Sequence, residues 1–178
     1  MITDLEQASL AGGCFWCLDA VFKQIKGVNK VVSGYSGGFV DNPRYEQLHK
    51  ENTGHAETVQ ITFDPEVISF AKLLEVFYSI HDPTTLNRQG NDIGEEYRSI
   101  IFYHDKQQKK IAEETTKDFV SKIWSEPIVT EIIPFDRFWP AEDYHQNYYQ
   151  NNTSAGYCQI IINPKLEKFR KQFRDLLR

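Results

Sequence analysis

The order of helical and strand patterns in the first hundred residues constrains the fold most strongly. Apolar residues recur there with strand and helix periods in the order β-α-β-β-α-β, which is the split β-α-β pattern. The predicted strands are residues 7–10, 28–35, 57–63 and 98–103, and the predicted helices are residues 15–25 and 69–80. Helices must pack on the sheet that such strands form. We therefore predict an α+β two-layer sandwich, with a mixed or antiparallel sheet, a ferredoxin-like core and extra helices.

The remaining residues add elements to this core. The spacing predicts amphipathic helices over residues 106–124 and 165–178, a strand over residues 128–133 and a short helix over residues 143–150. Residues 82–96 form a long polar segment, and loops of that length inside compact domains are usually functional or mobile. At 178 residues, we expect one domain over residues 1–178, with residues 159–178 as a C-terminal amphipathic helix segment.

Composition excludes several classes of protein. With 20 Lys and Arg against 25 Asp and Glu, the net charge is −5, which argues against a general nucleic-acid binder. No apolar run approaches the length of a membrane span, and the first residues lack the pattern of a signal peptide. The chain has three cysteines, which are too few for a disulfide scaffold. We expect a cytoplasmic monomer in a reducing compartment.

One cysteine stands where a predicted strand gives way to a predicted helix, in the run Gly12-Gly13-Cys14-Phe15-Trp16-Cys17. The first backbone N–H groups of a helix are unpaired, and the helix dipole is positive there. This position should stabilise the thiolate of Cys14 and lower its pKa. Cys14 is therefore the candidate nucleophile.

Cys17 completes a C-x-x-C motif with Cys14. The motif has three interpretations: a dithiol redox pair, half of a zinc site, or coincidence. Zinc requires two further ligands, and the histidines at 49, 55, 81, 104 and 145 offer no convincing spacing. We therefore predict no metal site. The bulky apolar Phe15 and Trp16 between the cysteines favour the floor of a pocket for an apolar ligand.

These residues carry a family resemblance. The run Gly13-Cys14-Phe15-Trp16 resembles the signature of the A-type peptide methionine sulfoxide reductases. Eight further blocks resemble that family in its own order: GYSGG at 34–38, NPRY at 42–45, GHAE at 54–57, DP at 64–65, HDPT at 81–84, LNRQGND at 86–92, EYRS at 96–99 and AEDYHQ at 141–146. The resemblance covers about residues 12–158.

The resemblance implies a reaction and a set of residues. The family reduces the S epimer of methionine sulfoxide, free or in oxidised proteins, with thioredoxin as the usual reductant, dithiothreitol as a substitute in vitro, and no bound cofactor. Phe15 and Trp16 resemble the walls that receive the substrate methyl group. The catalytic group that the resemblance implies consists of Cys14, Glu57, Tyr45, Tyr97 and Asp92.

The chemistry requires residues of these types. A sulfoxide sulfur is a poor electrophile until its oxygen is protonated or strongly hydrogen-bonded, so the nucleophile needs an acid beside it. Glu57 can serve if an apolar site raises its pKa, and the phenols of Tyr45 and Tyr97 can donate to the same oxygen. The attacking Cys14 is left as a sulfenic acid, which a second thiol must condense with.

Two cysteines are candidates for that second thiol. Cys158 follows a polar loop over residues 151–156 that could swing toward Cys14, and family members often keep a recycling cysteine in this region. Cys17 departs from the commonest family form, where glycine is usual, and could resolve the sulfenic acid directly or act as a shuttle. We favour Cys158, since two cysteines inside a regular helix would form a strained disulfide.

Three other functions remain open from the residues. A general dithiol-disulfide oxidoreductase would use Cys14 and Cys17. A binding module would recognise methionine or its sulfoxide with Phe15 and Trp16. A zinc-binding protein is the least supported of the three.

Overall fold

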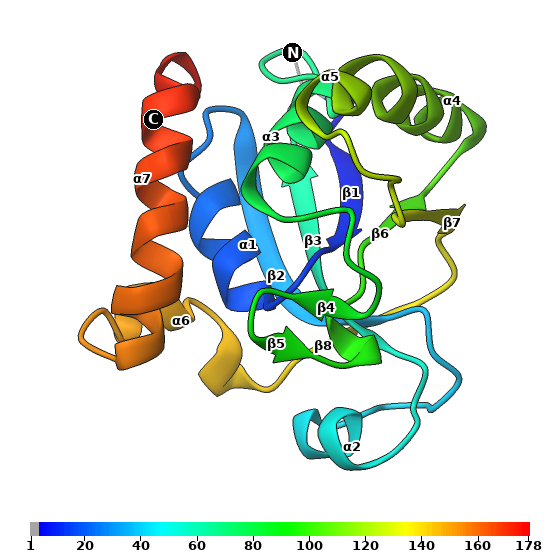
Figure 1. Ribbon diagram of the computed structural model, residues 1–178, viewed down its shortest axis with the longest axis vertical. Helices are drawn as coiled ribbons and strands as arrows, with labels where there is room; N and C mark the ends of the chain where they lie inside the picture. Colours follow the sequence, from blue (N-terminus) through cyan, green and yellow to red (C-terminus); the bar gives the residue numbers. More distant parts are fainter. Residues whose placement is uncertain (1–3) are drawn as a thin grey trace.

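Six strands form one mixed sheet in the order β7-β6-β1-β3-β2-β8 (Figure 1). The computed structural model describes residues 4–178. The strands are β1 (Glu6–Ala11), β2 (Val28–Ser36), β3 (Ala56–Phe63), β6 (Ile100–Tyr103), β7 (Glu131–Pro134) and β8 (Phe138–Pro140). β3 lies between β1 and β2 and is antiparallel to both, while β6 and β7 are parallel. The predicted α+β class and mixed sheet are confirmed.

Helical segments connect these strands and cover the sheet. The α-helices are α1 (Phe15–Phe22), α2 (Tyr45–Lys50), α3 (Phe70–Ile80), α4 (Lys106–Thr115), α5 (Ser121–Ile123), α6 (Tyr148–Asn151) and α7 (Asn163–Gln172). Two π-helical turns, η2 (Thr116–Val120) and η4 (Cys158–Ile162), precede α5 and α7. Short 3₁₀ turns are η1 (Glu95–Tyr97), η3 (Asp143–His145) and η5 (Arg174–Leu176).

The sheet separates a large core from a small one, because successive strand residues point to opposite faces. Leu10 of β1 belongs to the large core under the helices, whereas the next residue, Ala11, belongs to the small cluster on the other face. Phe22 of α1 and Phe77 of α3 are fully buried in the large core. Each contributes about 1.5–3 kcal/mol by leaving water. Figure 1 shows α7 beside α1, and these two helices are in contact.

The register of the sheet brings the ends of two strands together. Ala11, the last residue of β1, pairs with Thr58 of β3, and Glu57 pairs with Tyr35 of β2. The turn that leads from β1 into α1 therefore begins beside the first residues of β3. This register places Glu57 next to the cysteine-bearing turn.

The structure corrects the limits of two predicted helices. α1 ends at Phe22 rather than residue 25, because the amides of Gln24 and Ile25 donate to carbonyls three residues back in a tightened last turn. The C-terminal helical segment runs from Cys158 to Gln172 rather than over residues 165–178. Pro164 has no N–H to donate, and the wider π turn of η4 before it accommodates the missing bond.

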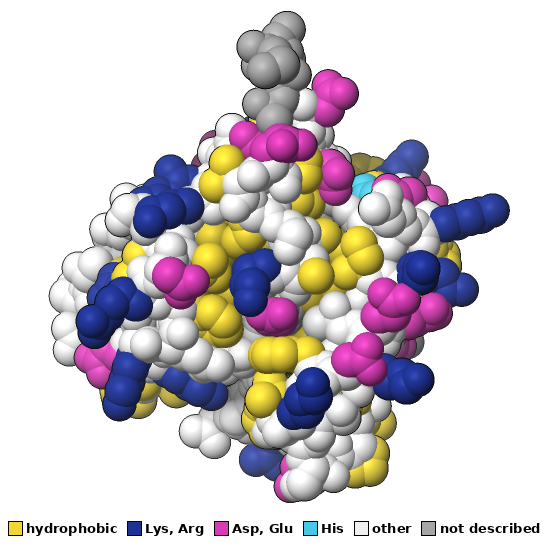
Figure 2. Space-filling view, turned by 90° about the horizontal axis from the view of Figure 1, so that it is seen from above, with side chains coloured by type: hydrophobic (Ala, Val, Ile, Leu, Met, Phe, Trp, Pro, Cys, Tyr) yellow, Lys and Arg dark blue, Asp and Glu magenta, His cyan; other side chains and the backbone are white. Residues whose placement is uncertain are grey.

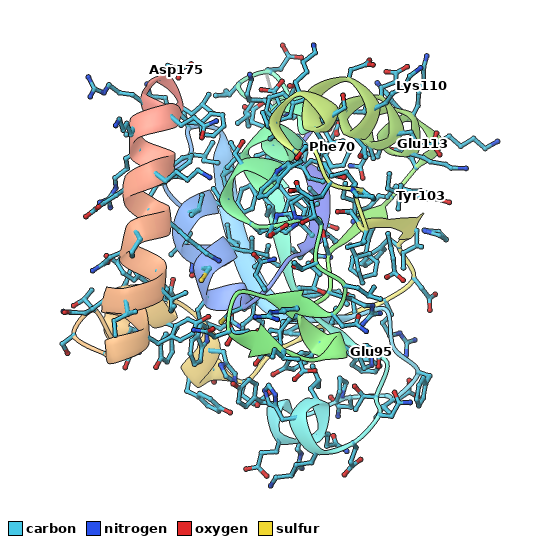
Figure 3. The ribbon with its side chains drawn as sticks, in the orientation of Figure 1. Phe70, Glu95, Tyr103, Lys110, Glu113 and Asp175 are labelled. Atoms are coloured by element: carbon cyan, nitrogen blue, oxygen red, sulfur yellow. The ribbon has the colours of Figure 1, made fainter. Side chains whose placement is uncertain are left out.

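The predicted loop over residues 82–96 contains regular structure. A two-stranded hairpin, β4 (Arg88–Gln89) and β5 (Asp92–Ile93), lies inside it and is followed by η1. Glu95, labelled in Figure 3, marks the start of η1 beside this hairpin. The hairpin strands are too short for an alternating pattern to appear in the sequence.

The surface is mixed in charge on the face that Figure 2 shows. Acidic and basic side chains are interspersed there around hydrophobic ones, rather than gathered by sign. Within residues 4–178, no helix combines the length and the hydropathy that crossing a membrane requires.

Candidate active site

A sharp turn at Gly13 places Cys14 at the start of α1. Gly13 has φ +81°, and a Cβ atom added to it would lie 2.6 Å from Cγ of Gln89. Both the backbone conformation and the space therefore require glycine. The Gly13 amide donates to the carbonyl of Tyr97 at 3.1 Å, which ties the turn to η1. Cys14 is the N-cap residue of α1, in an extended conformation, and is 7 % exposed.

Cys14 and Cys17 form a buried thiol pair. The backbone amide of Cys17 donates to the carbonyl of Cys14 at 3.1 Å. Burial raises the pKa of Cys14, and hydrogen bonding to Cys17 raises it further. The pKa of Cys17 falls to about 7, chiefly because its sulfur accepts a hydrogen bond from Cys14. The predicted lowering of the Cys14 pKa is therefore wrong for this state, since desolvation outweighs the helix N-terminus.

Glu57 is a buried carboxyl group next to this pair. Its side chain is 1 % exposed, and its Oε2 accepts the backbone N–H of Phe15 at 3.1 Å. Burial raises the pKa of Glu57 to about 8, although the Phe15 amide opposes the shift. The negative charges of Asp92 and Glu96 add to the rise. At neutral pH this group is therefore a neutral acid.

Tyr45 and Tyr97 approach Glu57 from α2 and η1. Burial raises the pKa of both phenols, so both remain protonated donors. The imidazole of His49 lies between them, with its ring centre 4.4 Å from that of Tyr45 and 6.1 Å from that of Tyr97. His49 also places Nε2 at 3.9 Å from Oε1 of Glu57 and Nδ1 at 2.9 Å from Glu96.

Trp16 is held in an aromatic cluster that also contains Tyr148, Tyr157 and His145. Its indole stacks on Tyr148 with ring centres 3.6 Å apart and planes 5° apart, and Tyr157 meets it edge-on at 5.7 Å. The indole N–H donates to Nδ1 of His145 at 3.0 Å. Phe15, by contrast, is fully buried and packs against His145 at 5.0 Å. Trp16 therefore presents the apolar surface near the thiol pair, and Phe15 supports it.

Asp92 and Cys158 meet this cluster through Tyr157. The phenol of Tyr157 donates to Oδ2 of Asp92 at 2.7 Å, which links β5 to the turn before η4. Cys158 is fully buried in η4, and burial raises its pKa. Residues 152–155 form the loop that the sequence predicts before Cys158, and Cys158 lies at the start of the helical segment that follows it.

Several neighbours of the predicted residues escaped the sequence reasoning. His145 lies 129 residues from Trp16 along the chain, so no local spacing links them. Glu142 accepts hydrogen bonds from Tyr35 at 3.0 Å, Tyr144 at 3.1 Å and the backbone amide of Tyr45 at 3.3 Å. The sequence signal for Glu142 and His145 was the block at 141–146, which resembles the family pattern but had no role assigned to these two residues.

The three cysteines are free thiols, and all three are buried. Within residues 4–178, no group of three or more His, Cys, Asp or Glu side chains is arranged to hold a metal ion. A thiol pair beside a neutral carboxylic acid and protonated phenols is suited to redox chemistry at sulfur. Fold and site together define a thiol oxidoreductase of the α+β class.

Comparison with known proteins identifies the family. A family model described as peptide methionine sulfoxide reductase matches residues 6–177. The peptide methionine sulfoxide reductase MsrA of Sulfolobus acidocaldarius is 56 % identical over 171 residues, covering 96 % of this chain and 97 % of that protein. The chain belongs to the peptide methionine sulfoxide reductase family.

Solved structures agree with this assignment. The reduced form of Mxr1 from Saccharomyces cerevisiae has a TM-score of 0.82 and 31 % identity, covering 89 % of this chain and 91 % of that one. Mxr1 in complex with Trx2 has a TM-score of 0.59 and 26 % identity, covering 83 % and 87 %.

Proposed function

We propose that the chain reduces methionine-S-sulfoxide, both protein-bound and free, to methionine. The observation that carries the proposal is the carboxyl group of Glu57, whose pKa is raised to about 8 beside Cys14. A sulfoxide oxygen is a weak base in water and needs a strong donor nearby before a thiol can attack the sulfur. A buried neutral acid supplies that donor without a competing charge.

In the proposed first step, the sulfur of Cys14 attacks the sulfoxide sulfur while Glu57 gives its proton to the oxygen. Oε2 of Glu57 accepts the Phe15 amide, which leaves Oε1 to carry the proton. Glu57 then takes the thiol proton of Cys14, so the site gains no net charge. The oxygen passes to Cys14 as a sulfenic acid, and methionine leaves with the two electrons that the thiol supplied.

The remaining residues of the site orient the substrate. Tyr45 and Tyr97 hold the oxygen with their phenol protons, which both retain at neutral pH. Trp16 receives the methyl group of the substrate, and the buried Phe15 supports Trp16. Asp92 acts through Tyr157, which it fixes against the indole of Trp16.

Resolution of the sulfenic acid uses a second cysteine, with release of one water molecule. Cys158 remains the resolver that the sequence favours, and its turn packs against α1. Cys17 is supported by a specific observation: Cys14 is an extended N-cap residue outside the regular helix. N-cap side chains face the amide three residues on, so the strain argued against a disulfide within a helix does not apply to this pair.

The disulfide is returned to thiols by thioredoxin, or by dithiothreitol in vitro. The complex of the yeast relative Mxr1 with Trx2 supports a thioredoxin as the reductant. The thiols themselves carry the two electrons, so the proposed cycle needs no bound cofactor.

Replacement of single cysteines tests this cycle. Cys14→Ser should abolish methionine formation, and full activity in that variant would refute the proposal. If Cys158 resolves, Cys158→Ser should form one methionine per enzyme and then stop with thioredoxin, while Cys17→Ser continues. The reverse pattern would assign resolution to Cys17, and mass spectrometry of the disulfide after one turnover provides an independent check.

A general dithiol-disulfide oxidoreductase is the second candidate. The lowered pKa of Cys17, at about 7, favours it, because a thiolate at neutral pH can exchange with disulfides. Reduction of insulin disulfides by the wild-type chain, without sulfoxide reduction, would support this second function.

A further inference from the structure

A groove lies beside the thiol pair, between the β4–β5 hairpin and the segment formed by η4 and α7. Its volume is about 570 Å³. One wall includes Gln89 and Asp92 of the hairpin, and the other includes Tyr157, Ile160 and Ile161. In Figure 1 the lower end of α7 and the hairpin flank the N-terminal end of α1. The groove opens next to the turn that carries Cys14, because a Cβ atom on Gly13 would lie 2.6 Å from Cγ of Gln89.

The groove shares one side chain with the aromatic cluster. Tyr157 lines the groove and also meets the indole of Trp16 edge-on at 5.7 Å. The bond of its phenol to Asp92 fixes the ring in this position at 2.7 Å. Electrostatic interactions with the Cys14 and Cys17 groups are among the causes that raise the Tyr157 pKa, as expected for a ring close to both sulfurs. A single aromatic ring thus separates the groove from the proposed substrate site.

The spacing between the proposed substrate site and the groove matches the spacing of side chains along an extended polypeptide. Same-side residues of an extended chain are about 7 Å apart, twice the rise per residue. When a methionine sulfoxide side chain lies against Trp16, the residue two positions along on the same side reaches past Tyr157. Its side chain then falls in the groove.

The lining of the groove defines the chemistry of that side chain. Ile160 is 73 % exposed, and it lies with Ile161 and Pro164 on the groove wall. Isolated exposed apolar residues are ordinary, but several that line one concave surface mark a contact site. An apolar side chain that covers Ile160 would remove both surfaces from water.

We propose that this groove is a subsite for an apolar side chain located two residues from methionine sulfoxide in an extended substrate segment. The proposal rests on the proposed function and deepens it. It makes extended segments with an apolar side chain two residues from methionine sulfoxide better substrates than segments with a charged side chain there.

The experiment compares three substrates under identical conditions. Two are blocked pentapeptides with a central methionine-S-sulfoxide, carrying Leu or Asp at both positions two residues away. The third is free methionine-S-sulfoxide, which cannot reach the groove. The wild-type enzyme should show kcat/KM about fivefold to tenfold higher for the Leu peptide than for the Asp peptide, which corresponds to burial of part of one leucine.

Two substitutions of Ile160 test the location of the subsite. Ile160→Asp should abolish the preference for the Leu peptide, and Ile160→Lys should shift the preference toward the Asp peptide. Both should leave the rate on free methionine sulfoxide unchanged, which also shows that each variant folds. Phe39→Asp is the matched control, because Phe39 is 71 % exposed and lies on a different hollow, and it should keep the wild-type ratio.

The outcomes separate the two proposals. Equal kcat/KM for the two peptides in the wild-type enzyme, or an unchanged ratio in both Ile160 variants, overturns the subsite. An increased KM for thioredoxin in the Ile160 variants, with peptide ratios unchanged, also overturns it and assigns the groove to the reductant. Absence of activity on all three substrates in the wild-type enzyme would instead refute the proposed function.

Discussion

Replacing Glu57 by glutamine should stabilise the fold while removing most of the activity. Glutamine has the shape of a protonated glutamate, and its amide oxygen can still accept the Phe15 amide that Oε2 accepts at 3.1 Å. What the substitution removes is the proton that Glu57 donates in the proposed reaction. It also removes the free-energy cost of burying a carboxyl group at a position where it cannot ionise.

The expected gain in the free energy of unfolding follows from the pKa of Glu57. In the unfolded chain this group titrates near 4.5, and in the folded protein at about 8. Between these values folding must take up a proton, so stability is fully present below pH 4.5 and is lost as pH rises to about 8. Each pH unit corresponds to about 1.4 kcal/mol, so the cost at pH 7 is about 3 kcal/mol. Glu57→Gln should recover about that amount at pH 7.

Two measurements check this prediction. Urea denaturation of wild type and Glu57→Gln at a series of pH values should give curves that diverge from about pH 5 to pH 8 and then run parallel. The comparison between variants cancels the other titrating groups. Single-turnover reduction of methionine sulfoxide should slow by about 10²–10⁴, the range for loss of a general acid.

Two results would refute the reasoning. Stability differences that stay constant from pH 5 to pH 8 would mean that Glu57 is ionised in the folded protein. Retention of activity in a stabilised Glu57→Gln would mean that the proton comes from another group, with the phenols of Tyr45 and Tyr97 as candidates. A Glu57→Ala control would not serve, because it leaves a cavity and an unpaired Phe15 amide.

Three further predictions concern the groups that support the site. His145→Leu leaves the Trp16 indole N–H without its acceptor at 3.0 Å, and an unsatisfied buried donor should raise KM about tenfold. Steady-state kinetics should show that His145→Gln restores the KM. Equal KM values in the two variants would contradict this role. Burial lowers the pKa of His81 from 6.5 to about 4. Denaturation curves should therefore show the wild type losing about 3 kcal/mol relative to His81→Gln as pH falls through that window. Gly13→Ala should destabilise the fold by about 1–3 kcal/mol through backbone strain and the 2.6 Å approach to Gln89. Gly90→Ala is the control, because Gly90 has φ +58° but open space around it. Equal losses of stability in the two variants would contradict the contact with Gln89.

The sequence predicted the parts of the site that lie close together along the chain. The glycine pair before Cys14 and the aromatic residues after it indicated a turn, a nucleophile and an apolar surface within six positions. Glu57 came from the family resemblance, and the argument that a sulfoxide needs an acid gave it a chemical role. Its burial depends on strand register, which a single sequence does not reveal.

Long-range contacts account for what could not be predicted. Trp16 meets Tyr148, Tyr157 and His145, which come from a segment more than a hundred residues away. The position of Cys158 in a helical turn depends on how η4 accommodates Pro164. The predicted loop ends before this turn, and no signal in the sequence indicated that the helix starts ahead of Pro164.

The protonation state of Cys14 shows why magnitudes must decide between competing effects. A helix N-terminus favours a nearby anion by about 0.3–1 kcal/mol, which lowers the pKa of a thiol by less than one unit. Desolvation of a fully buried group shifts a pKa by up to about 3–5 units in the opposite direction. Burial therefore keeps Cys14 protonated until a substrate arrives. We infer that nucleophile and acid are activated together: as Glu57 protonates the sulfoxide oxygen, the carboxylate it becomes is the base that the Cys14 thiol requires. In this arrangement a high thiol pKa is compatible with catalysis, and it protects Cys14 from oxidation between turnovers, since the neutral thiol is the less reactive form.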